Sequence, residues 1–292
     1  MTSLPDERLD CSDMNESSPG LPPAVESRVN AQPELQPGAI RVQLPSRGFF
    51  YEGRLPGGEV VLNPITTQEE KILLSPSGDR ELLLDTVLER CVNLGSEMPY
   101  SSLLVADKFF LLLQLRAISY GPQYSFSLRC GSCHTEDHVT LVMPDDVQLR
   151  VLTENDHEPF EVTLPVSKKV LGLRLLRVRD EQEIARYARQ KAFTRRAAEP
   201  GDPAYTYRLA QHIVTIDGEA TGVVSALAFC ETMVGQDSLV IRDAIEDNDC
   251  VADLVLTHAC SRCGDTHDEV MPLTADFFRP GATRRQRRHT VA

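Results

Sequence analysis

The sequence contains no tryptophan, and aromatic residues make up only 6% of the chain. Proteins that bind single-stranded nucleic acid stack the bases on aromatic side chains interleaved with basic ones, and no segment has that composition. Basic residues are also in deficit, because 30 Lys and Arg stand against 43 Asp and Glu and give a formal net charge of −13. Since phosphate binding relies on Lys and Arg, this balance argues against a protein that coats nucleic acid.

Long apolar runs are absent as well. The longest, Phe109–Leu113, is bracketed by charged and amide side chains, whereas a bilayer span requires roughly 20 apolar residues. The N-terminus carries Asp6, Glu7 and Asp10 and lacks the basic-then-apolar order of a secretory signal. We therefore expect a protein that folds in a reducing cytoplasm, where Cys-x-x-Cys pairs are more often metal-binding or redox-active than structural disulfides.

Known catalytic motifs are missing too. The chain has no Gly-rich phosphate loop, no Gly-x-Ser-x-Gly and no His-Glu-x-x-His sequence. Two carboxylate pairs, Glu69 with Glu70 and Asp145 with Asp146, stand in polar surroundings, and we interpret them as solvated surface charge. No catalytic residue and no small-molecule substrate is predicted, and we expect a non-enzymatic protein.

The sequence does contain two Cys-x-x-Cys pairs with strand-like flanks. The first lies in SLRCGSCHTEDHVTL (residues 127–141) and the second in VLTHACSRCGDTHDEVMPL (residues 255–273). Two intervening residues allow two thiolates to approach one metal ion from a tight turn, and Gly131 and Gly264 suit such turns. Structural zinc usually takes four ligands, so one pair is incomplete and two make a closed site. We predict a single structural Zn²⁺ site with the ligands Cys130, Cys133, Cys260 and Cys263.

The 126 residues between Cys133 and Cys260 far exceed the spacing of a compact zinc ribbon. This distance is no obstacle if the intervening segment is a folded unit whose ends return close together. The alternatives are two separate redox pairs, disulfides, loss of the metal, and replacement of a thiolate by a histidine. Neither pair begins a helix of a βαβ unit, which argues against thioredoxin-like chemistry. Because four thiolates leave no vacancy, we expect the neighbouring histidines at the surface: His134, His138, His258 and His267.

The order of hydrophobic patterns predicts an α+β protein. A helical N-terminal part and β-hairpins are closed by the split four-cysteine zinc ribbon, with an α/β insertion between the two knuckles. The first 40 residues hold six prolines and no aromatic residue, and this composition is typical of disorder. The predicted parts are a disordered acidic arm (1–40), an N-terminal core with the first knuckle (41–157), a mainly helical insertion (158–250), the second knuckle with closing strands (251–279) and a basic tail (280–292).

Hydrophobic periodicity predicts the individual elements. Thr66 followed by Glu69 has the capping-box form and predicts a short helix. Tyr124, Phe126 and Leu128 alternate with polar residues, which predicts a β-hairpin with the first cysteine pair at its tip. Further helices are expected at 80–93, 101–119, 180–196, 205–215, 223–233 and 238–248, and further strands at 60–62, 159–165, 170–179, 254–258 and 269–273.

Three stretches together resemble the baseplate hub or hub-assembly proteins of T4-like tailed bacteriophages. They are LPSRGFFYEG with the following NPITTQEEKILLSP (residues 44–76), DKFFLLLQLRAISYGPQYSFSLRCGSC (107–133) and CSRCGDTHDEVMPLTADFFRP (260–280). The resemblance covers residues 40–280 and implies a structural or assembly protein of a contractile tail. It also implies other tail proteins as partners, such as hub, tape-measure or wedge subunits. The implied location is the host cytoplasm during assembly, or the baseplate of the virion.

Two other functions stay open at this point. The basic tail, with Arg284, Arg285, Arg287 and Arg288, is expected to be solvated, but with the knuckle loops it would suit a zinc-ribbon module that binds nucleic acid. A thiol-disulfide enzyme would require reactive cysteines of low pKa, which bound zinc would quench. The segment LPSRGFFY is either a docking surface with exposed aromatic and Arg residues or an N-terminal strand packed on the core.

Overall fold

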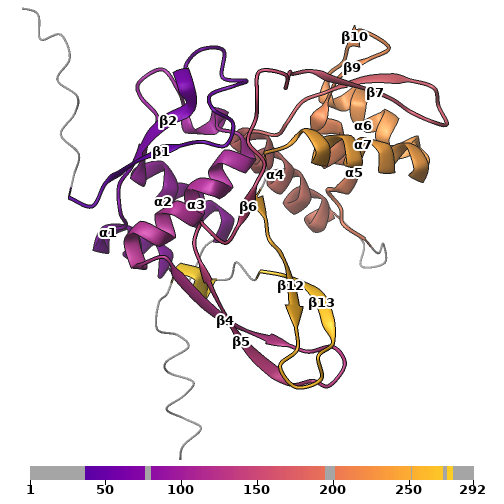
Figure 1. Ribbon diagram of the computed structural model, residues 1–292. Helices are drawn as coiled ribbons and strands as arrows, with labels where there is room; N and C mark the ends of the chain where they lie inside the picture. The colour runs from indigo at the N-terminus through magenta and orange to yellow at the C-terminus, as the bar shows by residue number, and fades with distance from the viewer. Residues whose placement is uncertain (1–36, 76–79, 195–200, 251, 272–274, 279–292) are drawn as a thin grey trace, which may run out of the picture. The chain divides into compact units, whose positions relative to one another are not determined.

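The computed structural model contains both helices and small antiparallel sheets, which confirms the predicted α+β class (Figure 1). Among the described residues, no helix has both the length and the apolar character that crossing a membrane requires. Most of the predicted arm (1–40) and all of the predicted basic tail (280–292) lie outside these residues. The described residues belong to one unit, Leu35–Ala292, and are 37–75, 80–194, 201–250, 252–271 and 275–278.

The first helix shows how local sequence sets the helix ends. Thr66 Oγ1 accepts from Gln68 N at 3.2 Å, and the Glu69 carboxylate accepts from Thr66 N at 3.1 Å, which confirms the predicted capping box. Glu69 also pairs with Arg90 Nε at 2.9 Å and its side chain is only 9% exposed, so its interpretation as solvated charge was wrong. The helices are α1 (Thr67–Leu73), α2 (Arg80–Cys91), α3 (Val105–Tyr120), α4 (Val178–Thr194), α5 (Tyr205–His212), α6 (Val223–Thr232) and α7 (Gly235–Asn248), with short 3₁₀ turns η1 (Pro56–Gly58), η2 (Tyr100–Ser102) and η3 (Ala275–Phe278).

The strands form several small antiparallel sheets. One has the order β1-β2-β3, a second has the order β10-β9-β8-β7, and three are two-stranded: β4-β5, β6-β11 and β12-β13. The strands are β1 (Ile40–Gln43), β2 (Glu59–Leu62), β3 (Val92–Asn93), β4 (Gln123–Arg129), β5 (Glu136–Val142), β6 (Gln148–Leu149), β7 (Phe160–Thr163), β8 (Val170–Leu173), β9 (Ile213–Ile216), β10 (Glu219–Ala220), β11 (Ala252–Asp253), β12 (Val255–Ala259) and β13 (Thr266–Val270).

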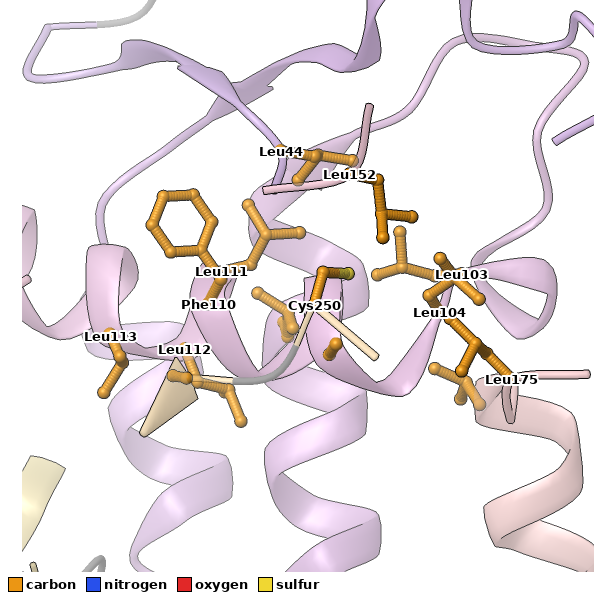
Figure 2. Packing of buried hydrophobic residues seen from close by; sticks show 14 of the residues in the cluster. Leu44, Leu103, Leu104, Phe110, Leu111, Leu112, Leu113, Leu152, Leu175 and Cys250 are labelled. Carbon is orange, nitrogen blue, oxygen red and sulfur yellow. The ribbon is translucent and has the colours of Figure 1, made fainter. Parts of the chain in front are cut away.

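The helix α3 lies at the centre of the hydrophobic core. Its leucines, such as Leu111, are fully buried, and full burial of one leucine stabilises the fold by about 1.5–3 kcal/mol. Figure 2 shows side chains from remote parts of the chain gathered around this helix, among them Leu44, Leu152 and Cys250. The segments before and after the first cysteine pair therefore share one core.

Several predicted elements differ from the structure. The strand predicted at 170–179 ends at Leu173, and Val178 already belongs to α4. The helix predicted at 205–215 ends at His212, and the run Ile213–Ile216 forms strand β9, because β-branched residues favour strands and pair here with β8. The helix predicted from Ser101 begins only at Val105. Leu103 and Leu104 are extended, since Val178 N donates to Leu103 O at 2.9 Å and Val105 N donates to Leu176 O at 3.0 Å.

The segment that follows β1 is fixed on α3 by a buried carboxylate. Asp107 is fully buried and accepts from Ser46 N at 3.0 Å and from the Tyr51 hydroxyl at 2.5 Å. The same hydroxyl accepts from Leu104 N at 2.9 Å. Burial raises the pKa of Asp107, while the hydrogen bonds from Ser46 and Tyr51 oppose this rise. LPSRGFFY thus continues β1 into an anchored loop, in which Arg47 is exposed.

The two ends of the long segment between the cysteine pairs meet at the β6–β11 strand pair. We call this strand pair, together with Arg150, the neck. In this pair Leu149 lies opposite Ala252. Beside it, Arg150 Nη1 donates to Asn248 O at 3.0 Å and to Asp249 O at 3.4 Å. Because β4-β5 ends shortly before the neck and β12-β13 begins shortly after it, the two hairpins come side by side (Figure 1).

The base of the first hairpin is held against the core by a buried arginine. Arg116 of α3 donates to Gln123 O at 2.8 Å and also to Gly121 O, where the chain turns into β4. Its guanidinium carbon lies 5.6 Å from the centre of the Tyr124 ring and 5.8 Å from that of Phe277. These two rings are in edge contact, 5.0 Å apart between centres. One arginine thus joins α3, the start of the first hairpin and the segment that follows the second.

Candidate metal centre

The two cysteine pairs occupy the turns of the two hairpins, β4-β5 and β12-β13. In the first turn Cys130 N donates to Thr135 O at 2.9 Å, and in the second Cys260 N donates to Asp265 O at 2.8 Å. Each turn has one residue in the left-handed region, Gly264 with φ +72° in the second and His134 with φ +58° in the first. The prediction that Gly131 takes this conformation was wrong, because the left-handed residue of each turn directly follows the second cysteine of the pair.

The four cysteine sulfurs lie within 4.8 Å of one another. Sulfurs from different hairpins are neighbours: Cys130 Sγ is 3.7 Å from Cys263 Sγ, and Cys133 Sγ is 3.5 Å from Cys260 Sγ. A tetrahedral zinc ion with Zn–S bonds of about 2.3 Å separates its sulfurs by roughly 3.8 Å. The donor atoms therefore have the type and the spacing that a four-thiolate metal site requires.

The thiols of Cys133 and Cys263 have pKa values that are shifted in opposite directions. Hydrogen bonds with Thr135 lower the pKa of Cys133 to about 6. The backbone N–H of Asp265 acts to lower the pKa of Cys263, but its hydrogen bonds with neighbouring thiols raise it to about 12. Four thiolate charges this close together repel one another, and a divalent cation among them would remove that repulsion.

Polar contacts also join the two hairpins. Asp137 of β5 accepts from Ser261 N at 3.0 Å, from the Ser261 hydroxyl and from His258 Nε2 at 3.0 Å. In the opposite direction, the Ser132 hydroxyl donates to the Asp265 carboxylate at 2.5 Å. The hydrogen bonds from the Ser261 hydroxyl and from His258 hold the pKa of Asp137 well below its usual range. None of these contacts was predicted from the sequence.

The four histidines near the cysteines have two different environments. His134 and His138 are exposed, as expected. His258 and His267 lie opposite each other on β12 and β13, and each side chain is 20% exposed, so these two are half-buried rather than fully exposed as predicted. Within the described part of the chain, the ring nitrogens of His267 are buried and have no hydrogen-bond partner. His267 also lies within 4.8 Å of Cys130 and Asp265.

The other described cysteines lie away from this cluster. Cys91, Cys230 and Cys250 are buried and unpaired, and Cys11 lies outside the described residues. Burial raises the pKa of Cys91 and of Cys230 to about 11 in each case. These thiols therefore behave as core side chains, as the apolar pattern around Cys91 and Cys230 predicted.

The family model described as T4 bacteriophage base plate protein matches residues 47–279, about four-fifths of the chain. Neither a curated protein nor a solved structure matches. The matched region includes most of the anchored loop, the central helix and both cysteine hairpins. The chain therefore belongs to the T4 bacteriophage base plate protein family.

Proposed function

We propose that this chain is a non-enzymatic structural or assembly protein of the hub region of a contractile tail baseplate, stabilised by one structural Zn²⁺ ion. The observation that carries this proposal is the convergence of four thiols from two hairpins that are remote in the sequence. Membership in the baseplate family supplies the biological setting. The ion would be held by Cys130, Cys133, Cys260 and Cys263.

Zinc is the metal that suits this donor set best. Soft thiolates select zinc or an iron–sulfur centre, and sulfur separations of 3.5 and 3.7 Å suit one small tetrahedral ion. When bound, zinc would neutralise thiolate charge and cross-link the two hairpins. Four protein ligands leave no open position for water or substrate, so the ion would serve as a clamp rather than as a Lewis acid.

The clamp requires that the chain bring the two hairpins together, and the neck supports this. We propose residues 158–250 as an insertion between two halves of the metal-binding part. In support, the sheet β10-β9-β8-β7 and the helices α4 to α7 all fall between β6 and β11. An insertion with paired ends adds surface to a protein without disturbing the part into which it is inserted.

The hub position is tested with assembled tails. A tagged copy of the chain would be supplied during infection by a phage that lacks it, and finished tails would be purified and cross-linked. Mass spectrometry should find cross-links from this chain to hub or tape-measure subunits. Cross-links to peripheral wedge subunits alone would overturn the hub position, and recovery of the chain only in unfinished tails would identify an assembly factor.

A further inference from the structure

Asp137 is a charged residue at a position where the strand pattern calls for an apolar one. On β5 it shares the inward face with Val139 and Leu141, and it is only 8% exposed. A carboxylate in such a place is tolerated only when hydrogen bonds replace its lost hydration. Its side-chain hydrogen bonds all come from the second hairpin, where Ser261 N and His258 Nε2 each lie 3.0 Å from Oδ2 and the Ser261 hydroxyl donates to Oδ1.

The position of Ser261 makes these contacts relevant to the metal centre. Ser261 N belongs to the peptide that directly follows Cys260, so fixing this N–H also fixes the backbone from which the Cys260 side chain projects. His258 precedes the same cysteine by two residues. Asp137 therefore holds both sides of Cys260, although it lies on the hairpin that carries Cys130 and Cys133.

We propose that Asp137 is a positioning residue for the metal centre: it docks the second hairpin on the first and so holds the four sulfurs within reach of one ion before the ion binds. This inference rests on the proposed zinc clamp. A site that is already assembled loses less conformational freedom when it binds, so its affinity is higher. Loss of a residue that orients metal ligands typically weakens metal binding 10–100-fold.

The test compares metal affinity among three variants of the full chain. Asp137→Ala removes the acceptor, Asp137→Asn keeps one carbonyl oxygen, and Glu136→Ala is the matched control, because Glu136 is the preceding residue on β5 and is exposed. Zinc is removed first, and zinc affinity is then measured by competition with a chromogenic chelator. We expect Asp137→Ala to bind 10–100-fold more weakly than wild type. We expect Asp137→Asn to be intermediate and Glu136→Ala to be unchanged.

Two further measurements separate positioning from general stability. Cobalt should give the absorption of a four-thiolate site in both wild type and Asp137→Ala, because the ligands themselves are retained. In metal-free wild type the Ser261 amide should be protected from hydrogen exchange, and in metal-free Asp137→Ala it should not be, while core amides of α3 stay protected in both. If Asp137→Ala does not fold, the same comparison is made with Asp137→Asn.

Failure of the zinc clamp and failure of the positioning role give different results. If wild type binds neither zinc nor cobalt, the clamp itself is wrong and this inference falls with it. If wild type binds zinc but both Asp137 variants bind as tightly as Glu136→Ala, the clamp stands and the positioning role is overturned. Equal exchange of the Ser261 amide in all metal-free forms would likewise overturn docking before metal binding.

Discussion

Leu149 of β6 lies directly opposite Ala252 of β11, although 102 residues separate them in the sequence. This pair closes the neck, and the two cysteine hairpins extend from it side by side (Figure 1). The neck therefore explains how thiols so far apart along the chain reach one place. Substitutions at the neck, in the anchored loop and at a buried histidine should change stability, and oxidation should join the hairpin turns.

The neck should depend on Arg150. Arg150→Ala removes hydrogen bonds to two backbone carbonyls and an ion pair with Asp156. Because the arginine side chain is 38% exposed, water replaces part of the loss, and we expect the free energy of unfolding to fall by about 1–2 kcal/mol. Urea denaturation of Arg150→Ala and of Arg129→Ala, an exposed arginine on β4, makes the comparison. Equal losses in the two variants would show that the neck contacts contribute nothing.

The anchored loop should tolerate no side chain at Gly48. A Cβ there would lie 2.1 Å from Leu55 O, and the residue has φ +81°. We expect Gly48→Ala to destabilise the protein by about 3 kcal/mol or more, as backbone would have to move. The control is Gly53→Ala, at φ +77°, where a Cβ meets no described atom within 4 Å. The left-handed conformation alone costs about 1–2 kcal/mol, and thermal unfolding should rank the two variants accordingly.

Mild acid should destabilise the protein through His212. Its ring is buried, Nδ1 lies 2.8 Å from Arg174 O, and burial lowers its pKa to about 4. The unfolded chain takes up this proton near pH 6.5, so stability is lost as pH falls from about 6.5 towards 4. Between pH 7 and pH 5 this group should remove about 2 kcal/mol.

The contribution of His212 to the pH dependence of stability is obtained by comparing wild type with a variant that does not titrate at this position. His212→Asn keeps an N–H donor for the Arg174 carbonyl but does not titrate. Denaturant unfolding at pH 7 and pH 5 should show a smaller loss for this variant than for wild type. Parallel pH profiles for the two proteins would mean that His212 is protonated as easily in the folded chain as in the unfolded one.

Oxidation of metal-free protein should join the hairpins covalently. Each peroxide molecule accepts two electrons from two thiols and yields one disulfide and two waters. We expect the pairs Cys130–Cys263 and Cys133–Cys260, because these sulfurs are 3.7 and 3.5 Å apart and come from different hairpins. Peptide mapping without reduction identifies the bonds. Disulfides found only within each Cys-x-x-Cys pair would show that the metal-free hairpins separate.

Local patterns were enough to predict most of the elements and the ligand candidates. The alternation Tyr124, Phe126, Leu128 led to the first hairpin, and the Cys-x-x-Cys spacing led to the four thiols that cluster. At Ile213 the local pattern predicted a helix where the chain forms a strand, because pairing with β8 outweighed helical periodicity. Such competition is decided by tertiary contacts, which no window of the sequence contains.

The polar contacts between the two hairpins could not be predicted from the sequence for a related reason. His258 and His267 were expected at the surface because four thiolates leave no vacancy for another ligand. Their partial burial depends on the register of β12 on β13 and of one hairpin on the other, which cannot be deduced from either strand alone. One feature of the sequence does indicate these contacts. Asp137 falls on the apolar face in the period-two pattern of Val139 and Leu141, and a charge in that register indicates a buried partner.

The central claim is that two remote hairpins share one structural metal ion, and metal content tests it most directly. The full chain would be purified without added zinc and analysed by mass spectrometry for metals, beside the double variant Cys133→Ser/Cys260→Ser, which removes one thiol from each hairpin. The account predicts one zinc per chain in wild type and none in the double variant. Folded wild-type protein that contains no zinc after this purification, or a double variant that keeps it, would contradict the account.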